Sequence, residues 1–150
     1  MTMSLRPLAS VLLLAALSEA ADAAAVGGIR AQLYYEETGR LSENIAGTDF
    51  AAFNVIIGEG SAEEQANDLL VAVEIVELGD DAPTPLRISV RNERGRILAR
   101  RTVAGPFYSE SGRLWKAVWL QDVGCAGPLT ITATLGRSTR TETIRLVCGE

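Results

Sequence analysis

Residues 69–78 have the sequence LLVAVEIVEL, and this stretch decides the fold class. From Leu69 to Ile75 an apolar side chain recurs at every second position, which is the period of a β-strand with one buried face. The stretch also has apolar residues at helical spacing behind SAEE at 61–64, a capping-box sequence. Its β-branched residues lose rotamer freedom in a helix and pack well on a sheet. We therefore predict a strand, preceded by a short helical turn near residues 61–66.

The same alternation recurs on both sides of this stretch. It is clearest at residues 86–91 (LRISVR), and NERG at 92–95 then suits a type I turn with its glycine in the left-handed conformation. The predicted strands are 29–36, 52–57, 69–78, 86–91, 96–103, 114–123, 129–135 and 140–147. Short strands joined by turns predict an all-β protein, a single antiparallel β-sandwich of about 7–8 strands.

In strand number and length this sandwich is similar to immunoglobulin-like domains. It departs from true immunoglobulin domains because both tryptophans precede both cysteines and the cysteines bracket one hairpin. The resemblance therefore implies an architecture and no function.

The first 23 residues predict a signal peptide. Arg6 is the only charge before an apolar run of about ten residues, and Ala21-Asp22-Ala23 fits a cleavage site. A membrane span would need roughly 20 apolar residues in a row, and Glu19 and Asp22 interrupt the run. We expect a signal peptide over 1–23, one domain over 24–150, and a periplasmic or secreted protein with no membrane span.

Cys125 and Cys148 are the only cysteines, and an oxidising compartment favours a disulfide between them. They lack the C-x-x-C spacing of a redox pair. The chain between them predicts a hairpin that turns at residues 136–139. The expected facing pairs are Leu129 with Leu146 and Ile131 with Ile144.

Charge is divided unequally along the chain. Residues 24–85 hold twelve acidic residues and two arginines, whereas residues 86–150 hold eleven basic and five acidic residues. Six arginines form a predicted basic stripe: Arg87, Arg91, Arg94, Arg96, Arg100 and Arg101. Such a stripe fits an anionic partner, and it equally fits a solvated strand face whose charges discourage edge-to-edge pairing. Without interleaved aromatic residues it does not predict nucleic-acid binding.

The few aromatic residues divide into two groups. Trp115 and Trp119 share one face of a predicted strand, and we expect them to fill the core; a sugar-stacking platform is the alternative. Phe107 and Tyr108 follow Gly105-Pro106 in a predicted loop, so we expect them to be exposed.

Catalytic motifs are missing from the sequence. With no histidine there is no Ser-His-Asp triad and no histidine-ligated zinc, and there is no glycine-rich phosphate loop. We expect a non-enzymatic protein without a cofactor. Two acidic loops, one with Glu59, Glu63, Glu64 and Asp68 and one with Asp80-Asp81, lack the D-x-D-x-D-G pattern, which leaves calcium binding open.

Three functions are compatible with these features. The first is an exported, non-catalytic interaction module that binds another envelope or extracellular protein through loops 37–51 and 58–67 or through a strand edge. The second is a small-ligand or anionic-polysaccharide binder that uses the arginine stripe. The third is an exported hydrolase inhibitor that presents a stiff loop, Ala126-Gly127-Pro128, beside Cys125.

Overall fold

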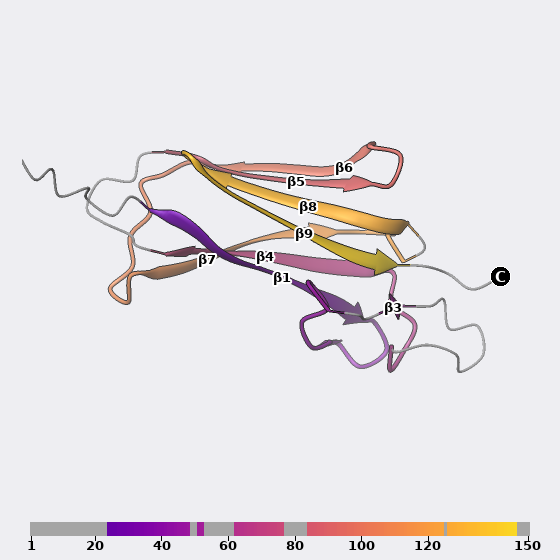
Figure 1. Cartoon of the computed structure of the whole chain (residues 1–150). Coiled ribbons are helices and arrows are strands. Elements are labelled where there is room, and N and C mark those ends of the chain that lie inside the picture. The colour runs from indigo at the N-terminus through magenta and orange to yellow at the C-terminus, as the bar shows by residue number, and fades with distance from the viewer. Residues whose placement is uncertain (1–23, 49–50, 53–61, 77–83, 125, 147–150) are drawn as a thin grey trace, which may run out of the picture.

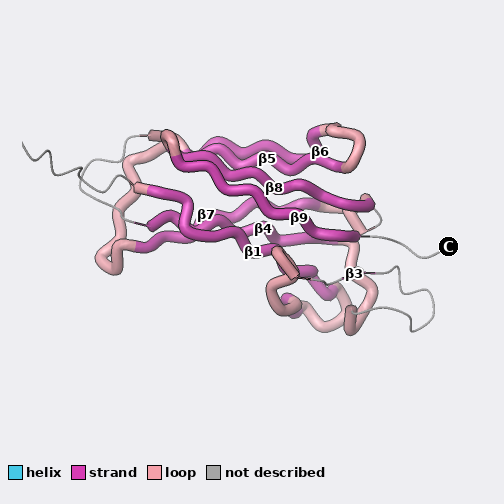
Figure 2. The backbone as a smooth tube through the Cα atoms, in the orientation of Figure 1, coloured by secondary structure: helices cyan, strands magenta, loops and turns pink. Residues whose placement is uncertain are grey.

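Nine strands form two sheets that pack face to face in the computed structural model (Figure 1). The structure describes residues 24–48, 51–52, 62–76, 84–124 and 126–146. Within these ranges there are strands, turns and loops but no helix (Figure 2). Accordingly, no helix of this part of the chain is long and apolar enough to cross a membrane.

Each sheet has a simple order. Sheet A contains, in order across the sheet, β2 (Arg40–Leu41), β1 (Ala25–Tyr35), β4 (Asp68–Val76) and β7 (Arg113–Leu120). Sheet B contains β3 (Ala51–Ala52), β9 (Ser138–Leu146), β8 (Gly127–Leu135), β5 (Leu86–Asn92) and β6 (Ile97–Val103). All neighbouring strands are antiparallel except β3 and β9. Without the short β2 and β3, this is a three-stranded sheet facing a four-stranded one, which confirms the predicted sandwich.

The core lies between the sheets and consists of alternate residues from each long strand. In β4, Leu69, Val71, Val73 and Ile75 are fully buried, so this stretch forms the predicted strand. Facing residues of sheet B are equally inaccessible to solvent: Leu86, Ile88, Val90, Leu129, Ile131 and Ala133. Burial of this much apolar surface is the main stabilising contribution to the fold.

The segment before β4 contains no helical turn among its described residues. Glu63 and Glu64 form a bend, and the chain then enters β4 at Asp68. The capping-box sequence therefore does not start a helix, because the strand that follows is fixed between β1 and β7. The predicted strand at 52–57 lies outside the described residues from 53 onward.

The turn between β5 and β6 has the predicted form. Gly95 adopts a left-handed φ of +75°, and its N–H donates to the carbonyl oxygen of Asn92 at 2.9 Å. Beyond the turn, the pairing of β5 with β6 has an irregularity between Val90 and Arg91, whose partners are Ala99 and Ile97.

The hairpin formed by β8 and β9 differs from the prediction in register. Leu129 faces Ile144, and Ile131 faces Glu142, because Leu135 and Ser138 close a turn of only two residues. Gly136, the first of these, has a φ of +58°. A two-residue turn with glycine first matches the twist of the flanking strands better than the expected longer turn.

The prediction that Trp115 and Trp119 fill the core is wrong. In β7 the alternate set faces inward, with Leu120 opposite Leu69 and Val118 opposite Val71. This set includes Lys116, whose ammonium group lies 5.9 Å from the centre of the Phe107 ring. Lys116 is tolerated there because β7 is an edge strand, where a long aliphatic stem can pack while the charge reaches the surface.

Two further predictions fall outside the described residues. The signal peptide over 1–23 is one of them. The disulfide between Cys125 and Cys148 is the other, and it remains a prediction.

Candidate functional site

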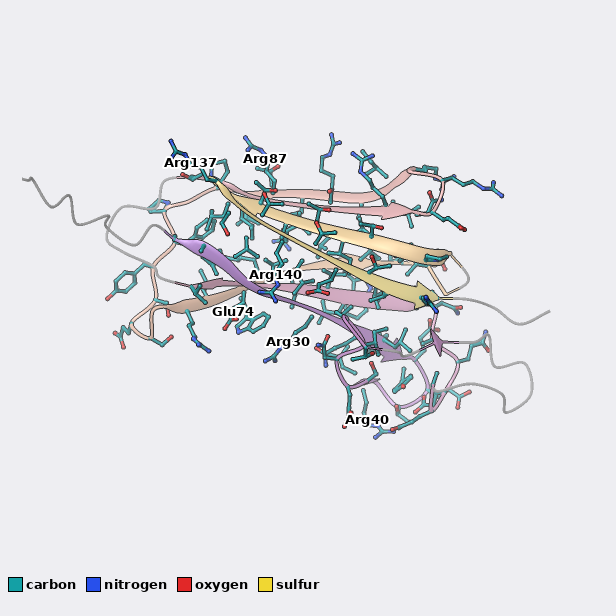
Figure 3. The ribbon with its side chains drawn as sticks, viewed as in Figure 1. Arg30, Arg40, Glu74, Arg87, Arg137 and Arg140 are labelled. Carbon is teal, nitrogen blue, oxygen red and sulfur yellow. The ribbon has the colours of Figure 1, made fainter. Side chains whose placement is uncertain are left out.

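The arginines of the predicted stripe divide among three places, and half of them share one surface. Arg87 and Arg91 point outward from β5, and Arg100 points outward from the neighbouring β6. Arg145 of β9 joins them on the same side of sheet B. In Figure 3, Arg87 points away from the sandwich on the side opposite Arg30 of sheet A.

Hydroxyl groups fill the space between these arginines. Threonines alternate with buried apolar residues along β8 and with Arg140, Glu142 and Ile144 along β9. Two cross-strand pairs, Thr132–Thr141 and Thr134–Thr139, are hydrogen-bonded at 3.3 and 3.1 Å. The outward hydroxyl residues are Ser89, Thr102, Thr130, Thr132, Thr134, Thr139, Thr141 and Thr143. Together with the four arginines they form what we call the arginine–threonine face.

A hollow of about 430 Å³ lies on this face across β6, β5 and β8. Arg87 pairs with Thr102 and Ser89 pairs with Arg100, so the two arginines occupy diagonal positions, roughly 7–8 Å apart at the backbone. The polar lining residues are Arg87, Ser89, Arg100, Thr102, Thr132 and Thr134. Guanidinium and hydroxyl groups in this arrangement are donors for carboxylate, sulfate or phosphate oxygens.

The arginine–threonine face has no compensating negative charge in the described part of the chain. None of the outward residues that β5, β6, β8 and β9 contribute to it is acidic. None of the ion pairs found among the described residues involves its four arginines. Arg91 does donate to the carbonyl oxygen of Gly95 at 3.1 Å, which orients that guanidinium along the hairpin.

The other three arginines of the stripe lie elsewhere. Arg94 is in the β5–β6 turn and Arg96 is the residue after it; both line a second hollow, described below. Arg101 emerges on the opposite side of β6 from Arg100 and donates to the carbonyl oxygen of Ala117 in β7. Arg101 therefore bridges the two sheets.

One of the two aromatic residues expected to be exposed is buried. Tyr108 is 74% exposed, as predicted, but Phe107 is only 4% exposed. Phe107 packs into the core at the end of the sandwich, beside Lys116. Adjacent residues of a loop at the sandwich end can face opposite ways, and loop composition does not predict which one turns inward.

The two tryptophans lie on the outer surface of sheet A. Trp119 is 41% exposed; its indole N–H donates to a carboxylate oxygen of Asp68 at 2.9 Å, and its ring meets Tyr34 edge to face at 5.1 Å between centroids. Trp115 is 37% exposed, and the guanidinium of Arg30 lies 4.3 Å from the centre of its ring. Cross-strand contacts therefore fix both indoles.

A second hollow, of about 830 Å³, lies beside Trp119 where β6 and β7 approach each other. The β5–β6 turn, the end of β7 and the start of β8 surround it. Its charged lining consists of Glu93, Arg94, Arg96 and Asp122.

The two loops predicted to meet a protein partner contact each other. Arg40 pairs with Glu63 at 3.1 Å and with Glu64 at 3.5 Å, and Thr38 donates to Glu64 at 2.7 Å. Ile45, in the first loop, is part of the buried core. The length of the first loop is thus explained in part by packing over the end of the sandwich.

The segment considered for an inhibitory loop is part of sheet B in the structure. Gly127 and Pro128 pair with Leu146 and Arg145 as the first residues of β8. The described residues contain no group of three or more acidic or cysteine side chains placed to hold a metal ion. Asp80 and Asp81 of the acidic loops lie outside those residues, and calcium binding there stays a hypothesis.

Comparison with known proteins adds little to this description. No protein-family model matches the chain, and no curated protein matches it. The solved structure of Bifidobacterium dentium beta-glucuronidase complexed with coumarin-3-O-glucuronide is similar over 83% of this chain and 17% of that chain, with 16% sequence identity and a TM-score of 0.43. The chain thus spans about a sixth of that enzyme, and a likeness this weak is no guide to function.

Proposed function

We propose that this protein is an exported, non-catalytic binding module whose arginine–threonine face binds an anionic polysaccharide. The observation that carries the proposal is the charge of this face: four arginines, eight hydroxyl residues and no acidic residue among the outward residues of β5, β6, β8 and β9. The protein as a whole has a net charge of −5, so this face differs in sign from the molecule that bears it. A localised potential of this kind attracts anions even to an acidic protein.

The shape of the face favours an extended ligand. The sheet offers donors on four adjacent strands, and its hollow lies across three of them. Guanidinium groups can bind carboxylate or sulfate groups in a bidentate manner, and the threonine hydroxyls can exchange hydrogen bonds with sugar hydroxyls. The absence of histidine from the sequence supports a role without acid–base catalysis by imidazole.

Heparin chromatography tests the proposal with variants in which each substitution removes one positive charge. We expect Arg100→Gln and Arg87→Gln to elute at lower salt than the parent, and the double variant to bind soluble heparin about tenfold or more weakly. The matched control is Arg40→Gln, which removes the same charge from sheet A and should elute with the parent.

The same experiment separates this function from the protein-partner hypothesis. Binding to the arginine–threonine face should weaken as salt rises, and chondroitin sulfate should compete while neutral dextran should not. Equal retention of Arg40→Gln and the double variant would contradict the proposal. A specific protein captured equally well by the parent and by the double variant would favour a partner at the loops or at a strand edge.

A further inference from the structure

The outer surface of sheet A has a different chemistry from the arginine–threonine face. Trp115 and Trp119 point outward from β7, four residues apart on the same side. At about 3.3 Å per residue their backbone positions are roughly 13 Å apart. Between them lie Ala117 and its partner on β4, Ala72, both half-buried residues with small side chains.

Charges on this surface balance. Arg113 pairs with Glu74 at 3.4 Å, and Figure 3 shows Glu74 and Arg30 on the same side of the sandwich. Asp68 accepts a hydrogen bond from Trp119 and adds a second negative charge to that of Glu74. The surface therefore has two positive groups, Arg30 and Arg113, and two negative groups. The hollow beside Trp119 is balanced in the same way, by two arginines and two acidic residues.

The polar groups around the indoles are arranged to exchange hydrogen bonds. A guanidinium stacked on an indole, as Arg30 is on Trp115, keeps its in-plane N–H groups available as donors. Gln121 and Asn92 line the hollow beside Trp119 and offer amide donors and acceptors. Fixed aromatic rings flanked by such groups suit a ligand with apolar ring faces and equatorial hydroxyls.

We propose that Trp115, Trp119 and the hollow beside Trp119 form a second site that binds an uncharged polysaccharide. Electrostatic complementarity supports a neutral ligand here, because the surface and the hollow each have no net charge. A protein partner fits less well, since stable protein interfaces have an apolar centre and bury about 800 Å² on each side. Here two tryptophans flank a pair of alanines, and each indole contacts a charged side chain, Arg30 at Trp115 and Asp68 at Trp119, whereas the cores of protein interfaces are depleted of charge.

The two tryptophans are the only ones in the chain, so their fluorescence reports on this site alone. We expect hydroxyethyl cellulose or glycogen, each added to the full chain, to shift tryptophan emission and to retard the protein in native gels containing that polysaccharide. This binding should be insensitive to salt. Heparin bound at the arginine–threonine face should leave the emission unchanged, so the two proposals can fail separately.

Substitutions test whether the ring of Trp119 contacts the polysaccharide. Trp119→Ala should reduce the affinity about tenfold or more, and Trp119→Phe, which keeps a ring, should retain most of it. Tyr108→Ala removes an exposed ring at the opposite end of β7 and is the control. Oxidation of the tryptophans of the parent protein by N-bromosuccinimide should abolish binding without any substitution.

Two results would overturn the inference. One is the absence of retardation and of an emission shift with both polysaccharides. The other is retardation that Trp119→Ala and oxidation leave unchanged. If Trp119→Ala instead converts a self-associated parent into a monomer in sedimentation, the surface is a protein interface and the inference is wrong.

Discussion

Leu69 and Leu70 are neighbours in the sequence, but they lie on opposite faces of β4. Leu69 is fully buried against sheet B, whereas Leu70 lies on the outer surface of sheet A opposite Trp119. Substituting each leucine in turn therefore separates the contribution of core burial to the free energy of unfolding from the contribution of β-propensity.

We predict that Leu69→Ala lowers the free energy of unfolding by about 2–5 kcal/mol, because it removes buried methyl groups and leaves a cavity. Leu70→Ala, the matched control, should cost less than about 1 kcal/mol. Urea denaturation monitored by circular dichroism measures both. Equal losses would mean that the two faces of β4 are wrongly assigned.

The tryptophans show why alternation alone does not identify the buried face. In β7 both sets of alternate residues contain apolar side chains. The set with Trp115 and Trp119 was predicted to face the core because large aromatic rings usually fill a core. The opposite set is buried because Leu120 and Val118 come opposite Leu69 and Val71 of β4. That pairing depends on strand order, which the sequence does not specify.

Among the elements, the β5–β6 hairpin depends most clearly on one residue. Gly95 has a φ of +75°, and a Cβ added there would meet no atom within 4 Å. Any cost of substitution at this position is therefore conformational rather than steric.

We predict that Gly95→Ala destabilises the protein by about 1 kcal/mol, because alanine is strained at positive φ. Gly95→Asn should cost less, since asparagine tolerates the left-handed region. Thermal denaturation of both variants tests this. If the two variants melt together below the parent, the left-handed conformation is not the cause.

The β8–β9 hairpin shows the limit of sequence patterns at this scale. Its strands and their buried faces could be predicted, but its register was displaced by two residues. A displacement by two keeps every side chain on its face, so the hydrophobic pattern is the same in both registers. Only the turn separates them, and glycine at 136 permitted either length.

On the scale of the whole molecule, the corrected register bears on the predicted disulfide. Gly127 faces Leu146, and each cysteine is two residues from this pair along the chain. In the register expected from the sequence, Cys148 would face Gly127, which is two residues away from Cys125. The observed register removes this offset of two residues.

We predict that the exported protein has no free thiol when denatured without reductant. Replacing both cysteines by serine should cost about 3 kcal/mol, as expected for a closed loop of this size in the chain-entropy model. Reduction of the parent should lower its melting temperature to that of the double-serine variant. The melting temperature of the double-serine variant should not change on reduction. Two titratable thiols in the unreduced parent would contradict the disulfide.

The candidate site could be predicted only in part. Alternation along one hairpin placed Arg87, Arg91 and Arg100 on one surface, because they are close in sequence. Arg145 was missed because β9 joins this surface through the order of sheet B. The regular spacing of threonines at 130–134 and 139–143 was a usable signal, since both runs alternate with inward residues.

The edges of the two sheets determine how readily two copies of the protein pair strand to strand at high concentration. Among the described strands, β2 and β3 are two residues long, β6 has an irregular pairing with β5 at Arg91, and the Ala117 carbonyl of β7 accepts from Arg101. The longer edge strands, β6 and β7, have seven and eight residues, and each is interrupted at one position by that irregularity or that side-chain contact. We expect such interruptions to make the edges poorer templates for pairing with another copy, and therefore for fibril growth.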